Sequence, residues 1–221
     1  MMMPLCLVTD RCRLSPDART PRDQVLALAV WLEEAVTAGV DLVCIRERDV
    51  SARLLGELLR AVRSCAQGSR TRVVASDRVD VAVAEGVDGV HLRGDGPPVA
   101  RARSLGPSGW LVGRSVHGMG EARLHADADY LFFGSVFPSG PKPGRGLAAL
   151  QTVVAASSAP VLAVGGITAE RARQCLAAGA SGVAAIGLFL PPGRTARALG
   201  ITAAAQALRA AIDHASRGHL Q

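Results

Sequence analysis

The stretch VGRSVH at residues 112–117, followed by DADYLFFGSVF at residues 127–137, decides the fold of this chain. Each segment is a short apolar run of strand length that closes on polar or small residues. These closing residues are Arg114, Ser115 and His117 in the first segment and Gly134 and Ser135 in the second, and Ser139 follows two residues after it. Apolar runs of this length are typical of buried strands in a parallel sheet. The polar residues at their ends are therefore candidates for a functional site.

Stretches with strand and helix patterns alternate along the whole chain. We expect strands at residues 5–9, 41–45, 72–75, 89–92, 111–115, 130–134, 161–164 and 182–186. We expect helices at residues 24–38, 51–66, 79–85, 98–104, 120–125, 147–156, 169–178 and 195–215. Strict alternation requires parallel strands joined by helical crossovers, and eight such units close into a TIM barrel. We predict an α/β chain that forms a single-domain (β/α)8 barrel over residues 1–221. An open doubly wound sheet is the alternative, but no Gly-x-Gly-x-x-Gly motif follows the first strand.

The composition favours a protein that acts on a small molecule. Hydrophobic residues make up 49% of the 221 residues, which is enough for a sizeable core. The net charge is +6, but the arginines are scattered and aromatic residues are only 3%, so we expect no nucleic-acid partner. The positive charge suits an anionic substrate, although an arginine-rich composition can equally reflect a GC-rich genome.

Cysteine usage and segment hydropathy favour the cytoplasm. Five cysteines without a Cys-x-x-Cys pair argue against a zinc site or a disulfide framework. No apolar stretch has the length of a membrane span, and charged residues interrupt the apolar start of the chain. We expect a cytoplasmic protein without a membrane partner, and we also expect it to form a homo-oligomer.

In a barrel of this class the functional site lies at the carboxyl ends of the strands. Gly165 and Gly166 follow the seventh predicted strand and precede a helix that opens at Thr168. Backbone N–H groups at such a turn bind phosphate, and the loops after strands seven and eight are the usual phosphate site of this fold. We therefore expect Gly165, Gly166 and Gly187 to bind a phosphate group. The alternative is that the glycines only permit a tight turn.

Charged residues follow the second and third predicted strands. Arg46 and Arg48 lie two residues apart, so an extended chain places both on one side, where they can face the barrel mouth. Alternatively, Arg46 forms a structural ion pair with Glu47. Asp77 is either a metal ligand or a helix cap that pairs with Arg78.

Other candidates lie at the same end of the predicted barrel. His117 follows the fifth strand, where a histidine can move protons near neutral pH; a packed, hydrogen-bonded loop histidine is the alternative. Lys142 lies in the Gly- and Pro-rich loop of residues 138–146, where it either binds an anion or is simply solvated. Ser115 and Ser139 add hydroxyl groups. Cys44 is expected to point into the barrel as a small packed residue.

These motifs together resemble the thiamine phosphate synthase/TenI superfamily. The markers, in order, are LVTD (7–10), IRERD (45–49), SDRVDVAVAEGVDGVHL (76–92), GRSVH (113–117), ADYLFFGSVFPS (128–139), KPGRG (142–146), PVLAVGGI (160–167) and AAGASGVAA (177–185). They cover nearly the whole chain. The family fold is a TIM barrel, in agreement with the pattern of strands and helices.

The superfamily has two main branches, which differ at the site. Synthases carry Gln-x-Arg-x-Lys on strand two, Asn-Asp after strand three, a second magnesium-binding Asp after strand four, and Thr-x-Thr-Lys in the loop after strand six. The residues at these positions here are, in the same order, Cys44, Arg46 and Arg48; Ser76 and Asp77; Gly96; and Ser139, Pro141 and Lys142. TenI-type thiazole tautomerases look more similar, because their second strand also ends IRER, their fifth strand ends GRSVH, and they lack the full magnesium and diphosphate set.

The resemblance implies a TenI-like thiazole tautomerase, an isomerase that moves one proton to aromatise a carboxylated thiazole phosphate. His117 would relay the proton and Arg46 or Arg48 would pair with the carboxylate. The other substrate-binding residues would be Ser115, Ser139, Lys142, Gly165, Gly166 and Gly187. This reaction needs no cofactor. The alternative is a thiamine phosphate synthase, which joins hydroxymethylpyrimidine diphosphate to thiazole phosphate and uses Mg²⁺ at Asp77. A third reading is a regulatory protein that binds the phosphate without catalysis.

Overall fold

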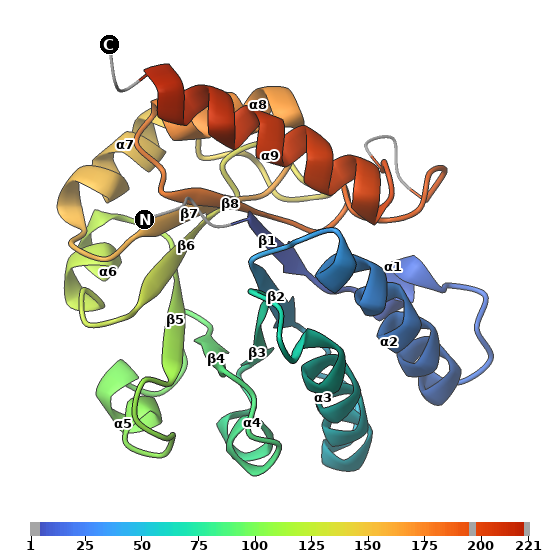
Figure 1. Ribbon diagram of the computed structural model, residues 1–221. Helices are drawn as coiled ribbons and strands as arrows, with labels where there is room; N and C mark the ends of the chain where they lie inside the picture. Colours follow the sequence, from blue (N-terminus) through green and yellow to red (C-terminus); the bar gives the residue numbers. More distant parts are fainter. Residues whose placement is uncertain (1–4, 195–197, 219–221) are drawn as a thin grey trace.

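Eight parallel strands close into a barrel in the computed structural model, which describes residues 5–194 and 198–218 (Figure 1). The strands are β1 (Leu5–Val8), β2 (Leu42–Ile45), β3 (Arg72–Ser76), β4 (Gly89–Leu92), β5 (Leu111–Val116), β6 (Tyr130–Gly134), β7 (Val161–Val164) and β8 (Gly182–Ala185). Neighbours in sequence pair in parallel, and β1 pairs with β8 to complete the ring. The predicted fold class is confirmed.

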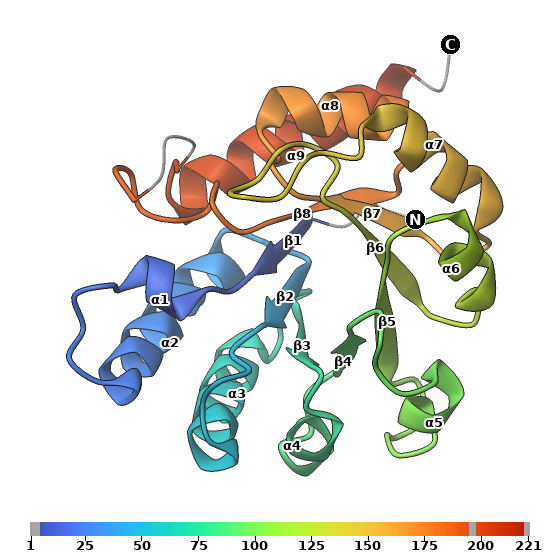
Figure 2. The same ribbon diagram turned by 180° about the vertical axis from the view of Figure 1, so that it is seen from behind.

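The helices surround the strands, as the two opposite views show (Figures 1 and 2). In the described part of the chain they are α1 (Arg11–Leu14), α2 (Pro21–Thr37), α3 (Ala52–Ala66), α4 (Val79–Ala84), α5 (Val99–Arg103), α6 (Met119–Leu124), α7 (Leu147–Ala156), α8 (Ala169–Ala177) and α9 (Ile201–Gly218). Helix α1 was not predicted. The last helix begins at Ile201, and its predicted start at Thr195 lies outside the described residues. No helix among the described residues is both long enough and apolar enough to span a membrane.

Alternation along the strands divides the apolar residues into two layers. Side chains that point inward fill the barrel, and they include Cys6, Cys44, Tyr130, Phe132 and Leu162. Their neighbours in the same strands point outward and pack against the helices in a larger cluster. Burying one large apolar side chain contributes about 1.5–3 kcal/mol, so both layers stabilise the barrel. Cys44 is a buried free thiol inside the barrel, as predicted.

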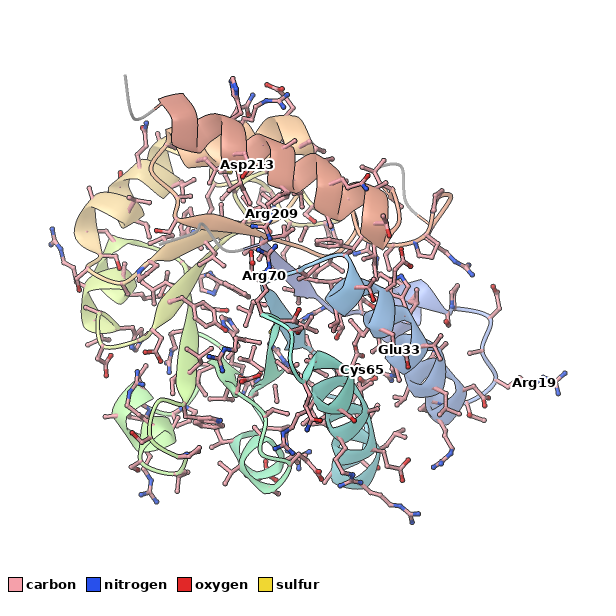
Figure 3. All side chains as sticks on the ribbon, in the orientation of Figure 1. Arg19, Glu33, Cys65, Arg70, Arg209 and Asp213 are labelled. Atoms are coloured by element: carbon pink, nitrogen blue, oxygen red, sulfur yellow. The ribbon has the colours of Figure 1, made fainter. Side chains whose placement is uncertain are left out.

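Acidic residues join neighbouring strands at the amino end of the barrel. Each accepts a hydrogen bond of 2.7–2.8 Å from a backbone N–H of the preceding strand, Asp41 from Leu5, Asp88 from Val73 and Asp129 from Val112. Arg70 and Arg209 both pair with Asp41, and Figure 3 shows them close together although they come from the α3–β3 loop and from α9. The charges at this end are therefore engaged in holding the barrel together.

Candidate active site

A cavity of about 1420 Å³ opens at the carboxyl ends of the strands. Every predicted site residue except Asp77 lines it, namely Arg46, Arg48, Ser115, His117, Ser139, Lys142, Gly165, Gly166 and Gly187. Ser115 lies near the end of β5, and the other residues follow β2, β5, β6, β7 and β8, so they meet only because the barrel closes. The location is the one at which enzymes of this fold carry their active sites.

Arg46 and Arg48 line the cavity, whereas Glu47 between them points away from it, because successive side chains of an extended chain point to opposite sides. Glu47 is buried beside α1, where its carboxylate accepts hydrogen bonds from Arg11 Nη1 at 2.9 Å and from Thr9 Oγ1 at 2.6 Å. Burial raises the pKa of Glu47, and the hydrogen bonds from Thr9 and Arg11 oppose that rise. The alternative of an Arg46–Glu47 ion pair is wrong, because Arg11 holds Glu47 instead.

Asp77 lies behind Arg48, in a left-handed backbone conformation with φ 64°. One carboxylate oxygen accepts a hydrogen bond from the Arg93 backbone N–H at 2.9 Å. The other, Oδ2, is buried and lies 2.8 Å from Arg48 Nε without an aligned hydrogen bond. Arg78 pairs with Asp80 at 2.7 Å, so the expected Asp77–Arg78 pair is wrong. Asp77 therefore orients Arg48 and holds the start of the loop after β4.

The turn between β7 and α8 packs tightly against the loop between β6 and α7. Gly165 and Gly166 have φ of 100° and 65°, which glycine adopts without strain. A Cβ at Gly166 would lie 2.8 Å from a backbone oxygen of loop residues 135–146, drawn in yellow in Figure 2. Arg171 links the two segments, because it donates to Gly166 O at 2.8 Å and lies 4.7 Å from the centre of the Phe137 ring. Among the described residues the Gly166 N–H has no acceptor, so it can donate to an anion.

His91 and Ser115 form part of the cavity floor. His91 Nε2 lies 2.9 Å from Ser115 Oγ, and Nδ1 lies 3.3 Å from the Tyr130 hydroxyl. The Phe132 ring is 4.1 Å from the His91 ring, centre to centre. Burial lowers the pKa of His91 to about 3, with smaller contributions from nearby arginines, so the ring is neutral in the folded protein. His91 lies in the predicted strand at residues 89–92 and Tyr130 in that at residues 130–134, but the sequence analysis gave neither residue a role.

His117 is exposed on the cavity wall rather than packed. Its backbone N–H donates to Glu121 Oε2 at 2.8 Å, which fixes the start of α6 against the end of β5. Its ring Nδ1 lies 3.4 Å from the Gly134 carbonyl oxygen at the end of β6. A histidine held by its backbone with an exposed ring can exchange protons with a bound ligand.

Cations outnumber acidic partners around the cavity. Three that line it face no acidic side chain in the part of the chain that the structure describes, namely Arg13, Lys142 and Arg145. Three more line it beside one carboxylate each, Arg46 at 3.6 Å from Asp10, Arg48 beside Asp77 and Arg93 at 2.8 Å from Asp95. Arg13 and Arg145 were not predicted as site residues. In the sequence they were marked only by the cluster of arginines at positions 11, 13, 19 and 22 and by the KPGRG motif at residues 142–146.

Arg114 does not face the cavity, although it was grouped with the polar residues at the mouth. It is buried, and its guanidinium donates to the backbone carbonyls of Gly94, Gly96 and Pro97. The reason is alternation, because Ser115 points into the barrel and its neighbour in the strand must point out. Arg114 thus holds the loop between β4 and α5 from outside.

The fold and the cation-lined cavity define a TIM barrel whose site suits an anionic small molecule. The family model described as thiamine monophosphate synthase matches residues 18–189, and this chain belongs to that thiamine phosphate synthase/TenI family. A Geobacter sulfurreducens protein, provisionally named thiamine-phosphate synthase, is 42% identical over 181 residues, which cover 78% of this chain and 85% of that protein. The thiamine-phosphate synthase of Methanoculleus marisnigri is 39% identical, with 79% and 83% covered.

Solved structures agree with the sequence comparison. The thiamine phosphate pyrophosphorylase from Pyrococcus furiosus superposes with a TM-score of 0.79 at 30% identity, and 96% of each chain is covered. These relatives place the chain in an enzyme family of thiamine biosynthesis.

Proposed function

We propose that this chain is a thiamine-phosphate synthase, a transferase that joins hydroxymethylpyrimidine diphosphate to thiazole phosphate and releases pyrophosphate. The observation that carries the proposal is the surplus of cations in one cavity, where Arg13, Lys142 and Arg145 have no acidic partner among the residues that the structure describes. A diphosphate and a monophosphate together suit this surplus better than one phosphate does. The cavity of about 1420 Å³ also exceeds the roughly 300–1,000 Å³ that one drug-sized ligand needs. The names of the relatives support the same reaction.

The residues of the cavity divide the work of this reaction. The thiazole phosphate is proposed to bind at the Gly166 N–H and the start of α8, where helix and backbone dipoles favour an anion. The diphosphate is proposed to lie among Arg46, Arg48 and Lys142. As the carbon–oxygen bond to the diphosphate breaks, negative charge grows on the departing oxygens. Cations that are already in place stabilise that charge without reorganisation.

Magnesium fits this site only together with the diphosphate. No group of three His, Cys, Asp or Glu side chains able to hold a metal occurs among the described residues. Mg²⁺ is often held by one or two carboxylates with substrate phosphates and water. Among the described residues, Asp77 Oδ2 is a buried carboxylate oxygen without a hydrogen bond, and it lies 2.8 Å from Arg48, which lines the cavity. Asp77 is therefore the residue that would hold the metal, behind Arg48 at the edge of the cavity. A bound Mg²⁺ would neutralise charge on the leaving diphosphate.

A second candidate is the thiazole tautomerase, which the exposed ring of His117 favours. This reaction needs one acid–base group, a phosphate anchor and a cation for the carboxylate. His117, the β7–α8 turn and Arg46 provide these groups around one cavity. The single carboxylate at Asp77, with Gly96 where synthases carry a second aspartate, also favours a reaction without metal.

One experiment distinguishes these functions. Purified protein receives hydroxymethylpyrimidine diphosphate and thiazole phosphate with Mg²⁺, and separately the carboxylated dihydrothiazole phosphate with EDTA. We expect thiamine phosphate and pyrophosphate in equal amounts in the first assay. Turnover in the second assay alone would replace the synthase by the tautomerase. Tight binding of thiazole phosphate without turnover in either assay would favour a regulatory protein.

His117→Gln tests the second candidate directly. Glutamine keeps much of the size of histidine but cannot cycle a proton near pH 7. If the chain is a tautomerase, kcat for aromatisation should fall by about 10²-fold or more with little change in ligand affinity. If it is a synthase, thiamine phosphate formation should fall much less. Unchanged aromatisation by folded variant protein would remove His117 from the tautomerase mechanism.

Three broader features stay predictions. They are the single domain over residues 1–221, the homo-oligomer and the cytoplasmic location. Light scattering of the purified protein measures the oligomeric state.

A further inference from the structure

The chain of contacts from Tyr130 through His91 to Ser115 connects the interior of the barrel to the cavity. Tyr130 is buried inside the barrel and does not line the cavity. The hydroxyl of Tyr130 has one hydrogen-bond partner among the described residues, His91 Nδ1 at 3.3 Å. The other ring nitrogen, His91 Nε2, lies 2.9 Å from Ser115 Oγ, and Ser115 lines the cavity. The three groups therefore form one chain of contacts from the buried interior of the barrel to the cavity.

Only one placement of the hydrogens gives every donor in this chain of contacts an acceptor. A neutral imidazole has one nitrogen that donates and one that accepts. The His91 ring is buried beside Tyr130 and Phe132 and has no acidic partner among the described residues that would stabilise a charged ring. If Nδ1 carried the hydrogen, the Tyr130 O–H would be a buried donor without an acceptor, which is costly. The Tyr130 hydroxyl must therefore donate to Nδ1, and the hydrogen of the ring lies on Nε2. Nε2–H then donates to Ser115 Oγ, so the Ser115 hydroxyl is left to donate into the cavity.

We propose that Tyr130 and His91 are positioning residues that make Ser115 a permanent hydrogen-bond donor toward the substrate. The part of the ligand on the cavity floor is then a hydrogen-bond acceptor, such as an unprotonated ring nitrogen or an anionic oxygen. A ligand that presents an N–H at this point meets a second donor and binds poorly. This inference rests on the proposed function, because it takes the cavity to be the substrate site.

Two substitutions test the proposal through kinetics. Tyr130→Phe keeps the ring but removes the hydroxyl, so His91 can adopt either tautomer and Ser115 loses its fixed direction. We expect kcat/KM to fall about 3- to 10-fold, the range for one poorly directed hydrogen bond. Ser115→Ala should cost about 10-fold or more. Because Tyr130 acts only through Ser115, the double variant should be no worse than Ser115→Ala.

A structural role predicts a different pattern. If Tyr130→Phe only loosened the barrel, its effect would multiply with that of Ser115→Ala, and this result would overturn the proposal. Trp110→Phe is the matched control, because it also removes a buried donor, the Nε1–H that bonds Val87 O at 2.8 Å, and it lies away from the cavity. The control should lower stability and leave kcat/KM of the folded protein unchanged.

A measurement on the protein without substrate separates this proposal from the proposed function. Nitrogen-15 histidine spectra report which ring nitrogen carries the hydrogen. The His91 signals are identified as those that are missing from the spectrum of His91→Gln. We expect the Nε2–H form in the wild type and a mixture in Tyr130→Phe. An Nδ1–H form in the wild type would overturn the proposal, whereas failure of both enzyme assays with an Nε2–H histidine would overturn only the function.

Discussion

At the scale of single residues, the direction of a side chain in its strand decides its role. Ser115 reaches the cavity while Arg114 holds a loop from outside, and Arg46 and Arg48 reach it while Glu47 does not. Strand alternation could have found these directions from the sequence. The ion-pair partners could not be found, because Arg11–Glu47 and Arg48–Asp77 join residues far apart in the chain. Arg13, Arg145 and Tyr130 were missed because their positions relative to the cavity depend on how distant strands and loops meet in the closed barrel.

Asp77→Asn separates the metal role from the structural role of this residue. Asparagine tolerates the left-handed conformation and keeps an oxygen for the Arg93 N–H, so the fold should be unchanged. It loses the negative charge that would hold Mg²⁺. We expect the Mg²⁺ concentration for half-maximal synthase activity to rise and kcat/KM to fall by about 10-fold or more. Unchanged metal dependence with an unchanged melting temperature would exclude Asp77 as a metal ligand.

Lys142→Met tests the cation surplus. Lys142 is exposed and has no acidic partner among the described residues, so its loss should leave stability within about 0.5 kcal/mol. If it binds the diphosphate, kcat/KM should fall about 10- to 100-fold, the worth of one hydrogen bond to a charged group. Arg123→Met removes an exposed cation from α6 outside the cavity, so it should have no effect. Equal kinetics for both variants would refute the role of Lys142.

At the scale of elements, long segments were predictable and short ones were not. Helix α3 lies where the sequence predicts it, and Ser51 caps it, since the Ser51 hydroxyl accepts from the Leu54 N–H at 3.2 Å. Helix α2 starts at Pro21, earlier than expected, because Thr20 and Asp23 form a reciprocal cap. Helix α1 has four residues, too few to show an apolar period, yet it carries the Arg11 that holds Glu47.

Gly166→Ala tests the contact between the β7–α8 turn and the loop of residues 135–146. Alanine at φ 65° costs about 1–2 kcal/mol, and its Cβ would also meet the loop backbone at 2.8 Å. Gly68→Ala is the matched control, because Gly68 has φ 77° with open space around it, at the end of α3. Both variants should lose stability in urea unfolding. Only Gly166→Ala should also weaken thiazole phosphate binding, by about tenfold or more in calorimetry. Equal affinities in the two variants would place the phosphate elsewhere.

At the scale of the whole molecule, barrel closure assembles what the sequence keeps apart. Eight alternations of strand and helix predict the fold strongly. Each right-handed crossover places the next strand in parallel beside the previous one in the same sheet. The cavity itself could not be predicted, since its shape depends on how loops from β2 to β8 meet across the ring. The same closure buries His91 and Tyr130 in the centre, and a titratable group buried there couples the stability of the whole barrel to pH.

His91 predicts a pH dependence of the free energy of unfolding. Its pKa is about 3 in the folded protein and about 6.5 in an unfolded chain, so below about pH 6.5 only the unfolded chain binds a proton. The stability that the neutral, buried His91 contributes to the folded protein is therefore fully present above pH 6.5, and it is lost as the pH falls toward 3. Between about pH 6 and 4 this residue should contribute a slope of about 1.4 kcal/mol per pH unit.

His91→Gln removes the group that takes up a proton when the chain unfolds, so the free energy of unfolding of that variant should depend less steeply on pH. Urea unfolding at a series of pH values gives the two slopes, and carboxylates that titrate in the same range contribute to both proteins alike. His125→Gln is the matched control, since burial also lowers the pKa of His125 but its side chain is only partly buried, and the change in slope should be smaller. Equal slopes for His91→Gln and the wild type would mean that His91 takes up a proton in the folded barrel, and the hydrogen-bond line from Tyr130 to Ser115 could not then hold one direction.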